Sequence, residues 1–228
     1  MLLGALLDAH PPSLWQRLQD ALRGLGLGEW HGHLASVQKS GIAATHMDFV
    51  IPATGHAHRG LSEILEIIDA SSLSAGVKES SARVFRRLGE AEARIHGMTL
   101  EDVHFHEVGA VDAILDITGF CFLLEELGIE HLYCQPLPQG RGAIDCAHGI
   151  FPNPGPATVE LLRGCPVRTL DVEQEMVTPT GAALLATLAR FEAPPIYRCD
   201  AVGYGAGTRE LPFSNVLRVQ IGEPLSAP

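Results

Sequence analysis

The chain has 228 residues, of which 46% are hydrophobic and 19% charged, and 16 basic residues stand against 27 acidic ones for a net charge of −11. This length and apolar content suffice for a sizeable core, in one large domain or two small lobes. The acidic balance argues against a nucleic-acid binder, which usually carries the opposite sign. No apolar run is long enough to cross a bilayer, so we expect no membrane partner.

The cysteines and the first residues bear on location. The five cysteines are an odd number, widely spaced and without a CxxC pair. This pattern favours a reducing cytoplasm over a disulfide framework or a zinc ribbon. The opening MLLGALLDAHPP has no basic segment at its start and no cleavage site, so it does not predict a signal peptide.

Hydrophobic periodicity, caps and turn residues predict helices and short strands that are interspersed along the chain. In chain order, the expected helices cover residues 1–9, 14–27 with Ser13 as its cap, 62–71, 76–97, 110–127 with Gly128 as its C-cap, 156–163 and 182–191. The expected strands cover 30–37, 43–51, 131–134, 144–150, 167–170 and 216–221, the first two forming a hairpin that turns near Gly41. Residues 136–142 are predicted as a loop. The fold class expected is mixed α/β (α+β), with short mixed sheets covered by amphipathic helices.

The stretch from 104 to 116, HFHEVGAVDAILD, is the strongest candidate site. His104 and His106 alternate, so an extended backbone would place them on one face, and Glu107 follows at once. Asp112 and Asp116 are four residues apart in the helix that follows and share a helical face. Imidazoles and carboxylates at this density suit a divalent transition metal or an acid–base pair.

The alternative is a helix N-terminus that carries acids because the macrodipole favours them there. This accounts well for Asp112. It accounts poorly for the two histidines and for Asp116, which stands among Ala, Ile and Leu. We therefore interpret the stretch as a site.

Other histidines give weaker signals. His46 shares a strand face with Asp48, and His56 and His58 form a His-x-His pair in a loop where metal binding and simple solvation are both compatible with the sequence. For His31 and His33 we favour the exposed polar face of a half-buried sheet.

Two features could bind an anion. Thr178-Pro179-Thr180-Gly181 precedes a helix, and hydroxyls and amides at such a position either hold an anion or simply cap the helix. The segment AVGYGAG at 201–207 is rich in glycine, which permits close approach of a backbone or a ligand.

These motifs together resemble a known family. In chain order they are HAHRGLSEI, HFHEVGAVDAILDI, HGIFPNPGPATVELLRG, TPTGAALL and VGYGAG. They are similar to the LarC family, the nickel insertases of nickel-pincer cofactor biosynthesis, and the resemblance runs from about residue 1 to 223. It implies insertion of Ni²⁺ into a pyridinium mononucleotide with two thiocarboxylates, pyridinium-3,5-bisthiocarboxylic acid mononucleotide, with CTP and Mn²⁺ or Mg²⁺. It also associates the stretch holding His56 and His58 with nickel handling.

On this resemblance we assign expected roles. The expected nickel ligands are His104, His106, Asp112 and Asp116, with His46, His56 and His58 receiving the incoming metal. His106 or Glu107 would accept the ring proton released when the nickel–carbon bond forms. The expected substrate-binding residues are Arg141, Thr178, Thr180, Gly181 and Arg209.

The chain also departs from the family pattern. It begins inside a predicted helix and lacks the DCFSGISGDM-like loop, and it stops where the CTP-binding C-terminal domain would begin. We therefore expect an N-terminal nickel-handling region over 1–223, possibly as lobes of about 1–128 and 129–223, with a tail at 224–228. It would need a separate CTP-binding domain or subunit and would be a homo-oligomer. The alternatives are a non-catalytic nickel-binding protein or fragment, a metal-dependent hydrolase of a phosphorylated small molecule, and a structural oligomer.

Overall fold

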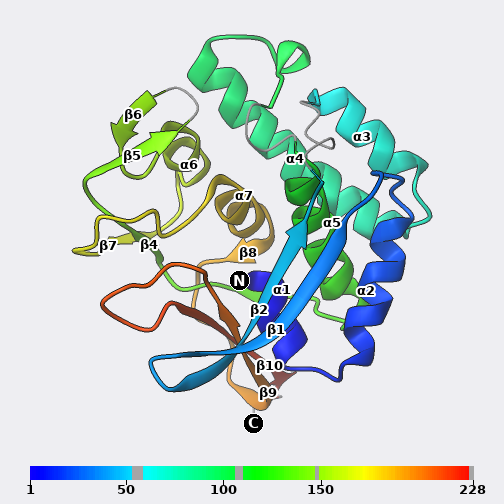
Figure 1. Cartoon of the computed structure of the whole chain (residues 1–228), viewed down its shortest axis with the longest axis vertical. Coiled ribbons are helices and arrows are strands. Elements are labelled where there is room, and N and C mark those ends of the chain that lie inside the picture. The colour runs from blue at the N-terminus through cyan, green and yellow to red at the C-terminus, as the bar shows by residue number, and fades with distance from the viewer. Residues whose placement is uncertain (53–58, 106–109, 147–148, 226–228) are drawn as a thin grey trace.

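The computed structural model describes residues 1–52, 59–105, 110–146 (only the backbone of 146) and 149–225. Helices and small mixed sheets alternate along this part of the chain in an α+β fold, as the sequence predicts (Figure 1). The helices are α1 (Leu2–Asp8), α2 (Ser13–Arg23), α3 (Leu61–Ala70), α4 (Ala75–His96), α5 (Val111–Glu126), α6 (Pro156–Leu161) and α7 (Pro179–Leu188). The strands are β1 (His31–Lys39), β2 (Ile42–Val50), β3 (Leu132–Tyr133), β4 (Leu137–Gln139), β5 (Ala143–Cys146), β6 (Gly149–Pro152), β7 (Val167–Thr169), β8 (Ala189–Arg190), β9 (Tyr197–Ala206) and β10 (Val216–Pro224).

The largest sheet has the order β1-β2-β9-β10. The hairpin of β1 and β2 is confirmed, and its tight turn uses positive φ angles of 50° at Ser40 and 81° at Gly41. Such angles twist a two-residue turn in the same sense as the strands it joins. β9 and β10 form a second antiparallel pair, and the two pairs meet where Thr45 of β2 lies beside Gly205 of β9.

Helix α1 packs directly on this sheet through the glycines of β9. A Cβ atom at Gly203 would overlap the carbonyl oxygen of Ala5, and one at Gly205 would overlap that of Met1. Asp8 fixes the contact, because its carboxylate accepts hydrogen bonds from the Tyr204 amide at 2.8 Å and the Thr45 hydroxyl at 2.7 Å. The glycines at 201–207 therefore serve close approach of a backbone, and the segment is a strand.

Helices α4 and α5 occupy the middle of the core (Figure 1). Helix α5 buries residues on nearly all sides, including Ile114 and Phe120, and an apolar helix of this kind belongs in an interior. Cys121 is buried there, and burial raises the pKa of its thiol to about 11, as fits a core residue. The glycine predicted beyond the end of this helix, Gly128, has a φ of 64°.

Several predicted boundaries differ from those observed. Ser13 is the first residue of α2 and not its cap, and the helix ends at Arg23 instead of about residue 27. The predicted loop at 136–142 contains β4, because Leu137–Gln139 pairs with β7. The predicted strand at 144–150 is part of the hairpin β5–β6.

At the C-terminal end, β10 runs further than predicted. Pro224, expected as the first residue of a tail, still pairs with Tyr197. The division into lobes near 128 stays a prediction. Over the described ranges, none of the helices is both long and apolar enough to span a membrane.

Candidate metal and substrate site

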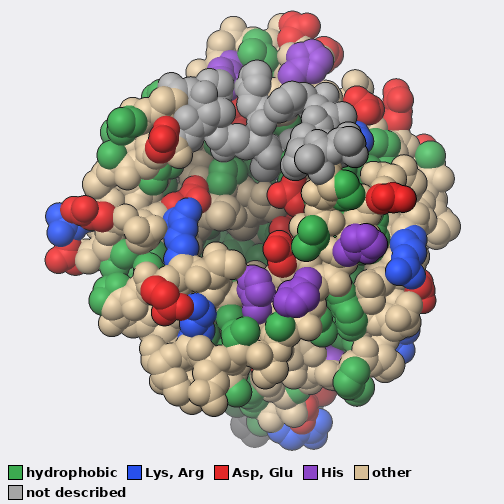
Figure 2. Space-filling view, in the orientation of Figure 1, with side chains coloured by type: hydrophobic (Ala, Val, Ile, Leu, Met, Phe, Trp, Pro, Cys, Tyr) green, Lys and Arg blue, Asp and Glu red, His purple; other side chains and the backbone are tan. Residues whose placement is uncertain are grey.

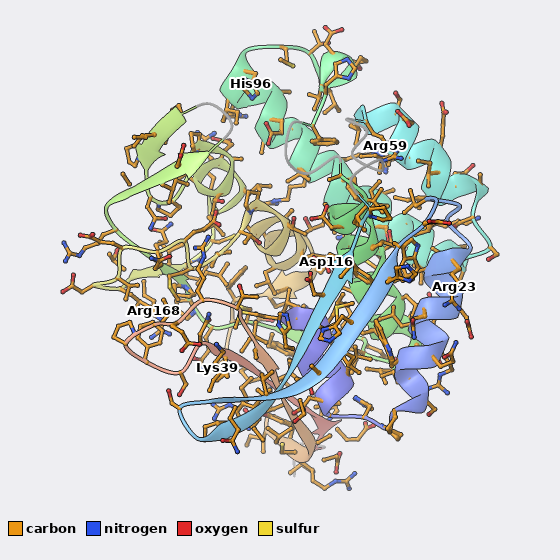
Figure 3. All side chains as sticks on the ribbon, in the orientation of Figure 1. Arg23, Lys39, Arg59, His96, Asp116 and Arg168 are labelled. Carbon is orange, nitrogen blue, oxygen red and sulfur yellow. The ribbon has the colours of Figure 1, made fainter. Side chains whose placement is uncertain are left out.

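Asp116 lies in the middle of the molecule on α5, a helix that also contacts β2 (Figure 3). Its side chain is half-buried between fully buried neighbours, Leu115 and Ile117. Burial raises the pKa of this carboxyl to about 7; the amino group of Met1 opposes the rise, whereas Asp112 and Asp48 add to it. Asp116 therefore exchanges a proton in the neutral range, where an ordinary aspartate is fully ionised.

The two neighbouring acids come from different elements. Asp112, in the first turn of α5, is exposed and accepts a hydrogen bond from the Ala113 amide at 2.9 Å. Its charge raises the pKa of Asp116, as expected for two carboxylates four residues apart on one helical face. Asp48 reaches the same region from β2, although the sequence analysis assigned it no role beyond sharing a strand face with His46.

Figure 2 shows acidic side chains and histidines together around a hollow in the middle of one face of the molecule. His46 lies two residues before Asp48 on β2, and its side chain is half-buried. Its Nδ1 lies 3.4 Å from the carbonyl oxygen of Ala206 on β9. This contact fixes which ring nitrogen faces the strand and which remains available.

His104 sits at a junction with the start of α3. It forms an isolated bridge with Gly60, and the amide of Phe105 donates to the carbonyl of Arg59 at 3.3 Å. Phe105 is fully buried and His104 is exposed, as the predicted alternation requires. A Cβ at Gly60 would lie 3.6 Å from Nδ1 of His104, an ordinary van der Waals distance, so the imidazole lies close beside this backbone.

Four of the predicted site residues lie outside the described part: His56, His58, His106 and Glu107. Within the described part, no group of three or more His, Cys, Asp or Glu side chains is close enough to hold a metal ion. His104, Asp112 and Asp116 therefore do not by themselves make a ready-formed site. The potential metal ligands that the structure describes are the carboxylates of Asp112 and Asp116 on α5 and of Asp48 on β2. The imidazoles of His46 and His104 lie on other segments.

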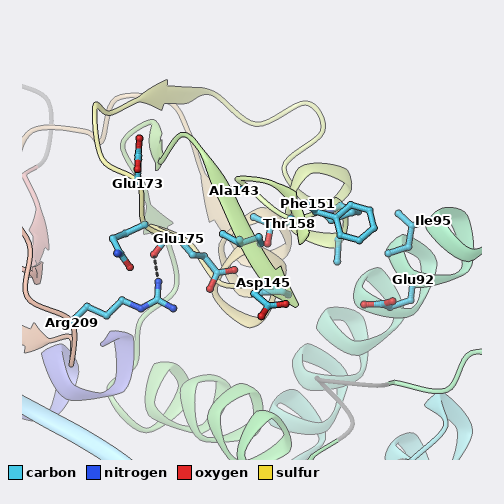
Figure 4. Close-up of a pocket in the computed structure, with 15 residues that line it drawn as sticks. Glu92, Ile95, Ala143, Asp145, Phe151, Thr158, Glu173, Glu175 and Arg209 are labelled. Carbon is cyan, nitrogen blue, oxygen red and sulfur yellow. Dashed lines mark hydrogen bonds between the residues drawn. The ribbon is translucent and has the colours of Figure 1, made fainter. Parts of the chain in front are cut away.

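A pocket of about 350 Å³ lies between α4, α6, the β5–β6 hairpin and the loop after β9 (Figure 4). Arg209 reaches it from that loop and donates to the carbonyl oxygen of Glu175 at 3.3 Å, while Glu92 of α4 lies on the opposite side. Asp145 and Glu173 also line it. Acidic side chains and one guanidinium thus line the same pocket.

Of the predicted substrate-binding residues, one lines the pocket and others cap helix α7. Among those that the structure describes, Arg209 alone lines the pocket, and Pro179 brings the first turn of α7 to it. The Thr178 hydroxyl accepts from the Gly181 amide at 3.2 Å, which is the capping alternative; Thr180 follows in the same turn.

Arg141 is exposed and pairs with Asp171 and, at 3.8 Å, with Glu173, which lines the pocket. Sequence reasoning missed Thr158, whose pocket-lining side chain is 1% exposed and whose hydroxyl has no hydrogen-bond partner among the described residues. A threonine inside a short apolar helix gives no signal of this.

An α+β protein with carboxylates and imidazoles around an open hollow has the donor chemistry of a protein that handles a divalent transition-metal ion. The comparison with protein families agrees. The chain belongs to the nickel insertion protein family, whose model matches residues 1–227. The resemblance drawn from the sequence motifs is thereby confirmed.

Individual relatives carry matching names. The chain is 48% identical over 224 residues to a pyridinium-3,5-bisthiocarboxylic acid mononucleotide nickel insertion protein of Desulfitobacterium hafniense, covering 98% of this chain and 55% of the relative. It is 45% identical over 222 residues to a protein of the same name from Staphylococcus epidermidis, covering 96% and 55%. A putative nickel insertion protein of Thermomicrobium roseum is 48% identical over 232 residues, covering 100% and 56%.

The chain therefore spans about half the length of the curated relatives it matches. No solved structure matches it significantly.

Proposed function

We propose that this chain handles Ni²⁺ for its insertion into pyridinium-3,5-bisthiocarboxylic acid mononucleotide, the molecule named in its relatives. The observation that carries this proposal is Asp116, a carboxyl held inside the fold with a pKa of about 7 and with two further carboxylates acting on it. Metal ligation requires the deprotonated form, so such a group exchanges proton for metal near neutral pH. A site of this kind suits an ion that is loaded and then released.

The histidines would complete the donor set. His104 and Asp112 would join Asp116 around the ion, with His106 as a further ligand, and His46, His56 and His58 would receive incoming metal. Imidazole nitrogen and carboxylate oxygen are both reasonable donors to nickel. The two thiocarboxylate groups of the substrate would then displace them by ligand exchange.

Formation of a nickel–carbon bond needs a base. The electron pair of a ring C–H bond becomes the bond to nickel, and the proton must leave to an acceptor within hydrogen-bond reach. His106 or Glu107 would accept it. In the sequence both lie a few residues before α5, whose first turns carry Asp112 and Asp116.

The pocket is the candidate substrate site. Its volume of about 350 Å³ falls in the usual range for small-molecule pockets. Arg209 supplies the cationic donor that a phosphate requires, and the α7 N-terminus at Thr178, Thr180 and Gly181 supplies hydroxyls and amides nearby. The pocket's carboxylates suit the positive pyridinium ring, and Arg141 would act at the rim through its contact with Glu173.

The complete reaction would need more than these residues. We propose that CTP, with Mn²⁺ or Mg²⁺, acts through a separate C-terminal domain or subunit, because the relatives extend well beyond the matched region. The protein would work in the cytoplasm as a homo-oligomer. The same partial coverage favours a second candidate, a nickel-binding unit that catalyses nothing until that other part is supplied.

An insertion assay tests the proposal. The untagged chain is given Ni²⁺, CTP, Mn²⁺ and the mononucleotide, with and without the C-terminal region of a relative, and the nickel-containing product is quantified. Product formation only with the added region supports the proposed need for that other part, and formation without it would show that the chain inserts nickel unaided. No product in either case refutes the proposed function.

The role of Asp116 is tested in the same assay with Asp116→Asn. The amide keeps the size of the side chain but cannot supply an anionic ligand, so we expect at least about a tenfold loss of insertion and of Ni²⁺ affinity. The control is Asp20→Asn, an exposed acid that pairs with Arg23 on α2. Equal activity in the two variants would remove Asp116 from the site.

A further inference from the structure

The pocket beside α6 has two chemically different ends (Figure 4). Arg209 lies at one end, where it donates to the carbonyl oxygen of Glu175. The other end is lined by Glu92 and Ile95 of α4 and by Phe151 of β6. A ligand with an anionic group at one end and a positively charged ring at the other would match this arrangement.

Negative charge dominates the lining of the pocket. Among the lining residues that the structure describes, four carboxylates stand against one guanidinium: those of Glu92, Asp145, Glu173 and Glu175 against that of Arg209. A cleft lined by charges of one sign attracts ligands of the opposite sign. The pocket therefore favours a ligand that carries positive charge outside its contact with Arg209.

Glu92 is the most buried of these acids. It is 9% exposed, and its Oε2 lies 3.3 Å from Nε2 of His96, one turn further along α4. Its side chain extends from α4 toward the wall that carries Asp145 (Figure 4). A carboxylate withdrawn from water interacts more strongly with a nearby cation than an exposed one does. Glu92 is therefore the acid whose interaction with a bound cation should be strongest.

Phe151 and Thr158 complete this end of the pocket. The face of a phenylalanine ring attracts a cation and stacks against a flat aromatic ring. Thr158 is 1% exposed, and its hydroxyl has no hydrogen-bond partner among the described residues. Since buried polar groups are nearly always paired, an unpaired hydroxyl on the wall of a pocket indicates a ligand that supplies the partner.

We propose that this pocket recognises the positive charge of a pyridinium ring. The ring lies against Phe151 with Glu92 beside it, the Thr158 hydroxyl bonds a substituent of the ring, and the phosphate binds Arg209 at the other end. The inference rests on the proposed function, which supplies a mononucleotide with a cationic ring as the ligand. It adds an orientation for that ligand and names Glu92 and Phe151 as the residues that set specificity.

Two forms of one compound separate the charge of the ring from its shape. Nicotinamide mononucleotide has a pyridinium ring and a phosphate, and its 1,4-dihydro form has nearly the same shape with an uncharged ring. Calorimetry of the full chain with each form, in the presence of EDTA, measures binding without nickel. We expect the parent chain to bind the oxidised form at least about tenfold more tightly than the reduced form.

Glu92→Gln keeps the size of the side chain and removes its charge. It should weaken binding of the oxidised form about tenfold and leave that of the reduced form within about twofold. A residue needed only for packing would affect both forms alike. Glu90→Gln is the matched control, because Glu90 is exposed on the same helix and does not line the pocket, and it should leave both affinities unchanged.

The two ends of the pocket are tested with separate variants. Phe151→Leu should weaken binding of both forms, and of the oxidised form more, because it removes the aromatic face. Arg209→Gln should weaken both mononucleotides about equally and leave nicotinamide riboside, which lacks the phosphate, unaffected. Circular dichroism of each variant checks that the fold is intact.

Equal affinity of the parent chain for the two forms, or an equal loss of both in Glu92→Gln, would overturn the inference. So would a lack of binding of either form at millimolar concentration. If the insertion assay still gives product in these cases, the proposed function stands and this orientation is wrong. A preference for the oxidised form that Glu92→Gln abolishes, together with no product in any insertion assay, would keep the pyridinium site and reject insertion.

Discussion

Asp116 has an altered pKa because of its place in the fold. Burial on α5 and the nearby charges of Asp112 and Asp48 raise the pKa of its carboxyl to about 7. A carboxylate among Ala, Ile and Leu is unusual, and Asp48 acts on it because the hairpin of β1 and β2 lies against α5.

The raised pKa makes stability depend on pH. From about pH 4 to 7 the unfolded chain has lost the Asp116 proton while the folded protein retains it, so the unfolded state binds fewer protons and stability falls as pH rises. We expect metal-free protein to lose about 2 kcal/mol, roughly 4–8 °C in Tm, between pH 5 and 7.5 relative to Asp116→Asn. Thermal melts of both proteins with a chelator present measure this. Parallel pH profiles would show that Asp116 titrates normally.

Histidines illustrate a limit of prediction from sequence at the scale of single residues. The sequence assigned His33 to an exposed polar face, and its exposure agrees. What the sequence could not supply was the register that sets it opposite Asp48. A shift of one residue in that pairing would send the two side chains to opposite faces.

At the scale of elements, the long helices were the easiest to predict. Ala75–His96 has strong amphipathic periodicity, Val111–Glu126 is a long apolar run, and both end near glycines with positive φ, Gly97 and Gly128. The short strands were harder because their pairing partners are distant. Leu137–Gln139 is a strand only because Val167–Thr169 lies beside it. The local sequence PLPQGRG contains no pattern that indicates this pairing.

The packing of α1 on β9 gives a prediction at this scale. Gly205→Ala would place a methyl group against the backbone of α1, which cannot move without disturbing the Asp8 hydrogen bonds to Thr45 and Tyr204. We expect a loss of about 1–3 kcal/mol or more in the free energy of unfolding, measured by urea titration. Val202→Ala, at an exposed position of the same strand, is the control and should change stability little. Similar midpoints for both variants would mean that the contact is loose.

At the scale of the whole molecule, the family was predictable because its motifs are spread over nearly the entire chain, and the match to residues 1–227 agrees. The arrangement of the site was harder to predict, because its parts come from elements far apart in the sequence. The acids that act on Asp116 lie on α5 and β2, and the pocket is lined by α6 and Arg209 among others. How far apart two motifs lie in space is a property of the assembled fold.

If nickel binds the folded chain at the hollow, it must also stabilise the whole protein. A ligand that binds only the native state at one hundred times its dissociation constant adds about 2.7 kcal/mol, which raises Tm by roughly 5–10 °C for a chain of this size. We expect this shift with Ni²⁺ at pH 7.5, its loss on adding EDTA, and a smaller shift at pH 6, where Asp116 is mostly protonated. Mg²⁺ at the same concentration is the control, because it prefers oxygen ligands and would not bind the imidazole nitrogens. A shift that is equal for the two metals, or independent of pH, would mean that the stabilising ion is held without the histidines and without Asp116.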